Sequence, residues 1–152
     1  QIGVLEQPLG SNKGPEVNAY LASVGLGPGF FWCMAFVYWC YQQAAGKLGK
    51  PNPLIKTAGV MAHWNGAGKA GTRRITTKEA TDNPGLIKPG MIFIISHGGG
   101  MGHTGLVESV NGGMLVTIEG NTNTEGSRNG IGVFRRTGRS IKSINKGFIQ
   151  YR

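Results

Sequence analysis

The chain has 152 residues, with 16 lysines and arginines against 7 aspartates and glutamates, for a net charge of +9 at pH 7. This length predicts a single domain over residues 1–152 with its own hydrophobic core. No apolar run approaches the roughly 18 residues of a membrane span, so membrane insertion is not expected. The cationic residues are dispersed rather than grouped, which argues against specific nucleic-acid recognition and fits a polyanion such as the bacterial cell wall.

The first half of the chain carries helix signals. A glycine, a proline and a glutamate in succession predict a helix over residues 15–24. A second helix is expected to begin at Cys33, behind a Gly-Pro-Gly breaker, and to end at Gly46. Thr57 is expected to cap a third, short helix over residues 58–64.

The second half predicts a sheet. Residues 69–88 are basic, rich in threonine and without periodicity, and are expected to form a long loop with one turn at 77–80. Strands follow at residues 91–95, 103–110, 114–119, 132–135 and 147–151, the last two resembling edge strands. Helices followed by an antiparallel sheet predict an α+β fold.

Cys33 is the first candidate for catalysis. The unpaired N–H groups and positive dipole end of a helix N-terminus favour a thiolate, which is the nucleophilic form of cysteine. Cys40 lies seven residues further along the same helix, about 10 Å away, which is beyond the ~7 Å reach of a disulfide. Cys40 is therefore expected to be a small buried apolar residue.

His103 is the expected general base, with Glu119 and Asn121 as the groups that orient it. A three-residue turn at 111–113 places His103 opposite Asn121 and diagonal to Glu119 on one sheet face. A two-residue turn would put them on opposite faces, and the Asn-Gly-Gly sequence permits either. A catalytic imidazole needs an acceptor on its second nitrogen, which favours the three-residue turn.

Other candidates have weaker support. Asn12 is a candidate second donor to an oxyanion, and Trp32 and Trp64 are candidate walls of a substrate groove. His63 is expected to be a packing residue and His97 a loop residue near the site. The sequence has no metal-binding motif, so neither a metal nor another cofactor is expected.

Four segments together resemble the CHAP family, the cysteine, histidine-dependent amidohydrolases/peptidases. They are Trp32-Cys33-x-x-Phe36-Val37-x-Trp39-Cys40, Pro89-Gly90-x-Ile92-x-Ile94, Gly102-His103-Thr104-Gly105-Leu106-Val107 and Glu119-Gly120-Asn121. The resemblance extends over roughly residues 11–151 and implies a papain-like fold, with N-terminal helices packed on the antiparallel sheet. It implies that Cys33 is the nucleophile, that His103 is the base and that Glu119 with Asn121 orients the base.

The resemblance also implies a substrate class, namely the amide bonds of bacterial peptidoglycan, at the sugar–peptide junction or within the peptide. This chain departs from the family at Met91, where an acid is usual. The stretch 25–29 holds no acid of the kind with which some members bind calcium, so no calcium site is expected.

The sequence therefore predicts a cysteine amidase or endopeptidase that hydrolyses peptidoglycan through a thioester. One alternative is a transferase that gives the same thioester to an amine. Another is a basic wall-binding or polyanion-binding module with a non-functional triad. The chain is expected to be a monomer acting outside the cytoplasm, as a secreted, periplasmic or phage-delivered protein. As an antibacterial effector it would have an immunity protein as partner. With no secretory signal at Gln1, it is expected to be a processed or trimmed piece of a longer protein.

Overall fold

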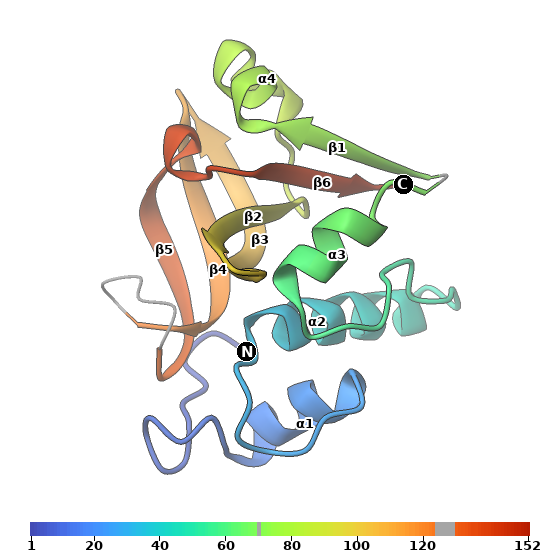
Figure 1. The fold of residues 1–152 in the computed structure, drawn as a ribbon, viewed down its shortest axis with the longest axis vertical. Coiled ribbons are helices and arrows are strands. Elements are labelled where there is room, and N and C mark those ends of the chain that lie inside the picture. The colour runs from blue at the N-terminus through green and yellow to red at the C-terminus, as the bar shows by residue number, and fades with distance from the viewer. Residues whose placement is uncertain (70, 124–129) are drawn as a thin grey trace.

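Six antiparallel strands form one sheet in the order β1-β6-β2-β3-β4-β5, and helices cover it (Figure 1). The computed structural model describes residues 1–69, 71–123 and 130–152. The helices are α1 (Pro15–Ser23), α2 (Cys33–Lys47), α3 (Val60–Gly66) and α4 (Thr77–Asp82), with 3-10 turns at Pro84–Leu86 and Ile141–Ser143. The strands are β1 (Thr72–Thr76), β2 (Ile92–Gly98), β3 (Met101–Asn111), β4 (Met114–Thr122), β5 (Gly132–Ser140) and β6 (Gly147–Tyr151). The predicted α+β class is confirmed.

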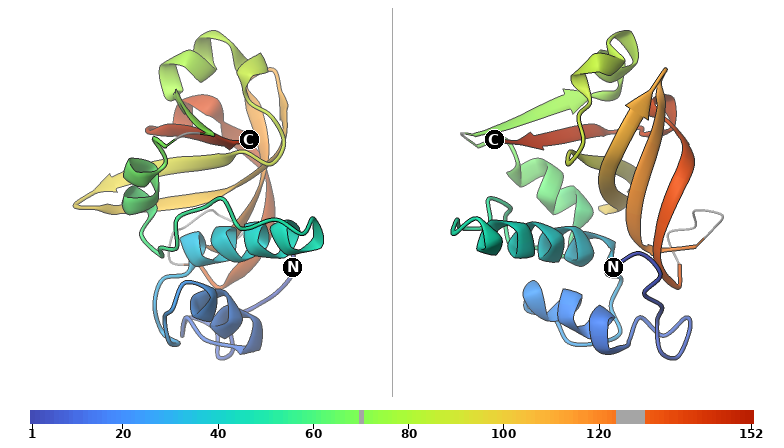
Figure 2. Two further views of the ribbon diagram at one scale, coloured as in Figure 1. Left: turned by 90° about the vertical axis from the view of Figure 1, so that its right-hand side faces the viewer. Right: turned by 180° about the vertical axis from the view of Figure 1, so that it is seen from behind.

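The first three helices lie close to where the sequence predicts them. Helix α1 follows Gly14 and has Pro15 at its first position, and α2 begins at Cys33. Helix α3 begins two residues later than expected, because the Thr57 hydroxyl accepts a hydrogen bond from the Gly59 N–H at 3.1 Å and so closes a turn ahead of the helix. Helices α1 and α2 stack at one end of the molecule and α4 lies at the other (Figure 2).

The expected loop over residues 69–88 is wrong, because this segment contains β1 and α4. Strand β1 has one buried residue, Ile75, and its remaining positions are exposed or half-buried, so its sequence has no clear two-residue periodicity. It is held by pairing with β6 instead, which makes β1 an edge strand and places β6 inside the sheet, contrary to expectation. Helix α4 begins with a capping box between Thr76 and Glu79.

The apolar core lies on both faces of the central strands. Ile92, Ile94 and Ile149 pack into one cluster with helices α1 and α2, whereas Phe93 and Phe148 pack into a second cluster beneath α4. Strands β2 and β6 are thus buried on both sides, which explains why β2 reads as an unbroken apolar run rather than as an alternating pattern.

The β3–β4 hairpin differs from the expected one in its turn but not in its register near His103. Asn111 pairs with Met114, so the turn has two residues rather than three. A bulge between Val107 and Ser109 takes up the odd residue, and beyond it Leu106 pairs with Ile118. Continued along both strands, this offset puts His103 opposite Asn121, as the three-residue turn would have done.

Candidate active site

Cys33 is the first residue of α2, and it lines a surface pocket. The residue is 6% exposed, and it and Cys40 are both free thiols. The N-cap, Trp32, makes no side-chain capping bond, which leaves the first-turn N–H groups free to act on a negative charge at this position. The expected placement of a thiol at a helix N-terminus is confirmed.

His103 lies on β3 and is buried, with its two ring nitrogens in different surroundings. Nε2 is 2.7 Å from Glu119 Oε2, whereas Nδ1 is buried without a hydrogen-bond partner among the described residues. Burial alone would lower the pKa of His103, but its interactions with Cys33 and Glu119 outweigh burial and raise that pKa to about 9. The imidazole is therefore cationic at neutral pH, with one nitrogen on the carboxylate and the thiol beside the ring.

Glu119 lies on β4, fully buried, and forms the second half of this pair. Burial would raise the pKa of Glu119, but hydrogen bonds from Arg139 and His103 lower it to about 2. Arg139 of β5 donates from Nε to Oε1 at 2.5 Å and from Nη2 to Oε2 at 2.8 Å. The Thr117 hydroxyl adds a bond to Oε1 at 2.6 Å. Glu119 is thus an ionised acceptor, and the hydrogen between it and His103 belongs to Nε2.

Asn121, at the end of β4, has a different environment from Glu119. Its backbone has a φ of 54°, in the left-handed region, and its side chain is fully buried. Both the amide nitrogen and the amide oxygen lack a hydrogen-bond partner among the described residues. A buried polar group of this kind costs about 1–3 kcal/mol, which points to a function. Glu119 therefore binds the imidazole, whereas the Asn121 amide bonds to none of the residues that the structure describes.

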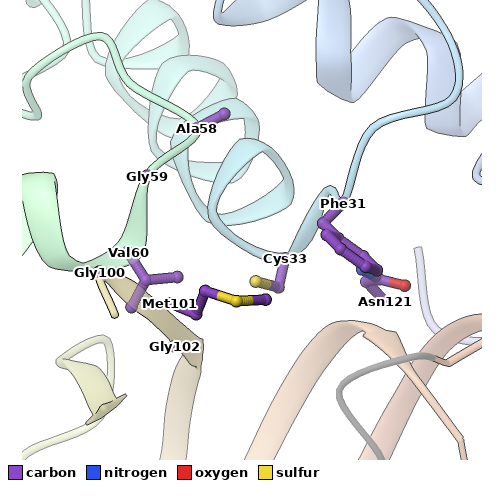
Figure 3. Close-up of a pocket in the computed structure, with 9 residues that line it drawn as sticks. All are labelled: Phe31, Cys33, Ala58, Gly59, Val60, Gly100, Met101, Gly102 and Asn121. Carbon is purple, nitrogen blue, oxygen red and sulfur yellow. The ribbon is translucent and has the colours of Figure 1, made fainter. Parts of the chain in front are cut away.

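The pocket joins Cys33 to Asn121 and has a volume of about 140 Å³. Figure 3 shows Cys33 in the middle, with Met101 and Val60 on one side and Phe31 and Asn121 on the other. The remaining lining residues are Ala58, Gly59, Gly100 and Gly102. None of the described lining residues is charged, so an amide reaching Cys33 would meet a largely apolar wall there.

Three expected site residues lie elsewhere. Trp32 is 0% exposed, stacks on Tyr20 and donates its indole N–H to the buried Glu6 at 2.8 Å, so the expectation that it contacts a substrate is wrong. Trp64 belongs to the apolar core, with Arg74 over its ring, and Asn12 uses its backbone carbonyl to accept a bond from a nearby loop N–H. Neither Trp64 nor Asn12 lines the pocket around Cys33.

The other histidines and the second cysteine are not at this pocket. His63 is buried on α3 and hydrogen-bonded through Nε2 to the Tyr151 hydroxyl at 2.8 Å, and its burial lowers its pKa to about 4. His97 is exposed on β2 rather than in a loop. Burial raises the pKa of the Cys40 thiol to about 12, which keeps it protonated and unreactive.

Sequence reasoning missed Arg139 and the two exposed pocket residues, Phe31 and Met101. Arg139 lies eighteen residues after Asn121 on β5, and no local pattern distinguishes it from its neighbour Arg136. Phe31 and Met101 carried a weak signal, since one is an aromatic residue directly before the helix and the other interrupts a run of glycines. Among the described residues, no group of three or more His, Cys, Asp or Glu side chains is arranged to hold a metal. None of the described helices is long and apolar enough to cross a membrane.

Comparison with known proteins gives one result. The family model described as the CHAP domain matches residues 25–121, which is well over half of the chain and includes Cys33, His103 and Glu119. Neither the curated proteins nor the solved structures gave a match. The match agrees with the α+β, papain-like arrangement of N-terminal helices on an antiparallel sheet. The chain therefore belongs to the CHAP domain family, a family of peptidoglycan hydrolases that act as amidases or peptidases.

Proposed function

We propose that this chain is a cysteine-dependent peptidoglycan hydrolase that cleaves an amide bond of the bacterial cell wall through a thioester. The observation that carries the proposal is the arrangement of three groups. A thiol at a helix N-terminus lies beside an imidazole whose far nitrogen is fixed by an ionised carboxylate. This is the arrangement of nucleophile, base and orienting group that acyl transfer requires.

The reaction begins when the Cys33 sulfur attacks the amide carbonyl carbon, so that a C–S bond forms and the carbonyl oxygen becomes an oxyanion. The Cys33 N–H at the start of α2 is one donor to that oxyanion. The Asn121 amide lines the same pocket and has no hydrogen-bond partner in the described part of the chain, so we assign it as the second donor. This role replaces the sequence-based expectation for Asn12.

His103 then moves the protons. As imidazolium it gives its Nδ1 proton to the departing amine when the C–N bond breaks, which leaves a thioester on Cys33. Neutral His103 next takes a proton from water, and the resulting hydroxide attacks the thioester carbon. The C–S bond then breaks, which returns Cys33 as its thiolate and releases the product as a carboxylic acid that loses its proton to solvent. Glu119 holds the imidazole by Nε2 throughout and stays ionised, because Arg139 keeps its pKa low.

We also propose that residues 1–152 form one catalytic domain and that the protein acts as a monomer. Residues 1–24 lie outside the family match but are joined to the rest. The Gly3 N–H donates to the carbonyl of Val133 within β5, and the Glu6 N–H donates to the carbonyl of Ile131 directly before it. The substrate is found outside the cytoplasm, so we propose secretion, periplasmic export or delivery by phage.

The test is digestion of purified peptidoglycan by the wild type, Cys33→Ala and Cys40→Ala, followed by mass spectrometry of the released fragments. Cys40→Ala makes the same change on the same helix and is expected to leave activity intact. Free glycan strands with whole stem peptides would identify an amidase, and cut stem peptides an endopeptidase. Equal release by Cys33→Ala and the wild type would refute the hydrolase proposal. Amine-capped products in place of free carboxylates would favour a transferase.

A further inference from the structure

A second concave surface lies at the other end of α2, away from Cys33. It consists of two adjoining hollows of about 450 and 170 Å³, which share Tyr41 and Tyr151 in their walls. No described residue is common to this surface and the Cys33 pocket. Because α2 has 15 residues, its two ends are about 20 Å apart. We call this surface the tyrosine trough.

The two tyrosines form a fixed aromatic wall. Their ring centroids are 5.7 Å apart with the rings inclined at 65°. Each hydroxyl is held, since that of Tyr41 donates to the Gly90 carbonyl at 2.7 Å and that of Tyr151 is bonded to His63 at 2.8 Å. Burial raises the pKa of both phenols, so both remain neutral. With both hydroxyls fixed, the rings have little conformational freedom to lose on binding.

The rest of the trough combines exposed apolar surface with positive charge. Leu48, directly after α2, is 71% exposed, and prolines 51, 53 and 89 stiffen the walls. The charged residues of the described lining are Lys50, Lys88 and Arg152, and none of the described lining residues is acidic. A ligand complementary to this surface has apolar faces and carries negative charges at intervals along its length.

We propose that the tyrosine trough binds the glycan strand of peptidoglycan, with sugar faces on the tyrosine rings and stem-peptide carboxylates on Lys50, Lys88 and Arg152. The identity of the polymer rests on the proposed function, whereas the existence of the trough does not. A strand held here would raise the concentration of its own amide bonds near Cys33 by tethering them. The trough would therefore matter for the insoluble wall and not for a short soluble fragment.

The test measures binding without hydrolysis. Cys33→Ala protein is sedimented with peptidoglycan freed of attached phosphate polymers, alone and with the added change Lys50→Glu or Arg152→Glu. The control is Lys142→Glu, an equal charge change in the exposed 3-10 turn after β5. Each trough variant is expected to bind roughly fivefold more weakly, as for the loss of about 1 kcal/mol. The control variant is expected to weaken binding to peptidoglycan by less than half as much as a trough variant does. Circular dichroism checks that each variant is folded.

A second readout uses the same changes in active protein. Lys50→Glu should slow digestion of intact wall yet leave the rate on a soluble muropeptide unchanged. An equal loss of peptidoglycan binding in Lys50→Glu and Lys142→Glu would refute the proposed role of the trough. Binding that requires the attached phosphate polymers, or that an acidic protein abolishes by competition, would refute it as well. Wild-type protein that binds the wall through Lys50 but cleaves nothing would refute the proposed function alone.

Discussion

At the scale of single residues, the interactions of His103 with Cys33 and Glu119 set the upper pH limit of activity. Glu119 and Cys33 raise the pKa of His103 to about 9, against the pull of burial, so the imidazolium form persists up to that pH and is lost above it. We expect kcat/KM on a soluble muropeptide to fall above about pH 9. Glu119→Gln removes a negative charge that raises this pKa, so the fall of kcat/KM at alkaline pH should begin at a lower pH in this variant. An unchanged onset of this fall in the variant would show that Glu119 does not act on the imidazole.

Arg139 differs from Arg135 on the same strand, because it makes a paired hydrogen bond to the buried Glu119. Arg139→Gln leaves that carboxylate without its paired hydrogen bonds from a guanidinium, and we expect a loss of about 3 kcal/mol in the free energy of unfolding at pH 7. The control is Arg135→Gln, which breaks an exposed pair with Glu108 and should cost under about 1 kcal/mol. Denaturant titration measures both, and similar losses would contradict the assignment.

The pair of Glu119 and Arg139 also predicts how the stability of the fold depends on pH. The pKa of Glu119 is lowered to about 2 in the folded state and is about 4.3 when unfolded, so ionisation favours the fold. This contribution is fully present above about pH 4.3 and is lost as the pH falls toward 2. In Arg139→Gln the pKa of Glu119 is raised, so stability should depend less steeply on pH over this interval. Unfolding midpoints measured from pH 5 to pH 2 test this slope.

Asn121 allows activity to be separated from stability. Asn121→Gly removes the free amide but suits the left-handed backbone, where glycine is unstrained. We expect kcat to fall about 100-fold, as for the loss of one oxyanion donor, with little change in melting temperature. Retained activity in a folded Asn121→Gly protein would rule out the oxyanion role.

At the scale of secondary-structure elements, the bulge in β3 explains why His103 and Glu119 share a face. The residue count between them leaves one unpaired residue, which the hairpin places at Glu108 rather than in the turn. Deleting Glu108 should therefore give a regular hairpin with the same pairs near His103 and most of the wild-type activity. Deleting Glu108 and Ser109 together removes one residue more than the bulge contains, so it should put His103 and Glu119 on opposite faces and abolish activity. The opposite order of effects would contradict this account.

The helices and the catalytic hairpin were predictable because their signals are local. Proline at the start of α1, a thiol directly after a breaker, and two apolar runs around Asn-Gly-Gly each need only a few neighbouring residues. Strand β1 was not predictable, since pairing with β6 holds it rather than any pattern of its own. Helix α4 carried an overlooked signal, the Thr76-x-x-Glu79 capping box. The contact between Arg139 and Glu119 depends on the alignment of β5 with β4, which no local sequence pattern specifies.

At the scale of the whole molecule, the net charge of +9 predicts salt-dependent activity on an anionic wall. The attraction acts beyond contact distance only at low ionic strength, because the screening length is about 10 Å at 0.1 M salt and about 3 Å at 1 M. We expect digestion of intact peptidoglycan to slow as salt rises over this range, while cleavage of a short soluble fragment changes little. Equal salt dependence for both substrates would show that the field of the protein does not assist encounter with the wall.

The order of the catalytic groups along the chain has a consequence for biosynthesis. Cys33 leads the first long helix, whereas the arginine that keeps Glu119 ionised lies about a hundred residues later, on β5. At about 5–20 residues per second, a ribosome makes the nucleophile several seconds before that partner. A nascent or truncated chain that stops before β5 carries the thiol without its completed counter-ions. The topology thus delays catalytic competence until the far side of the sheet has been synthesised.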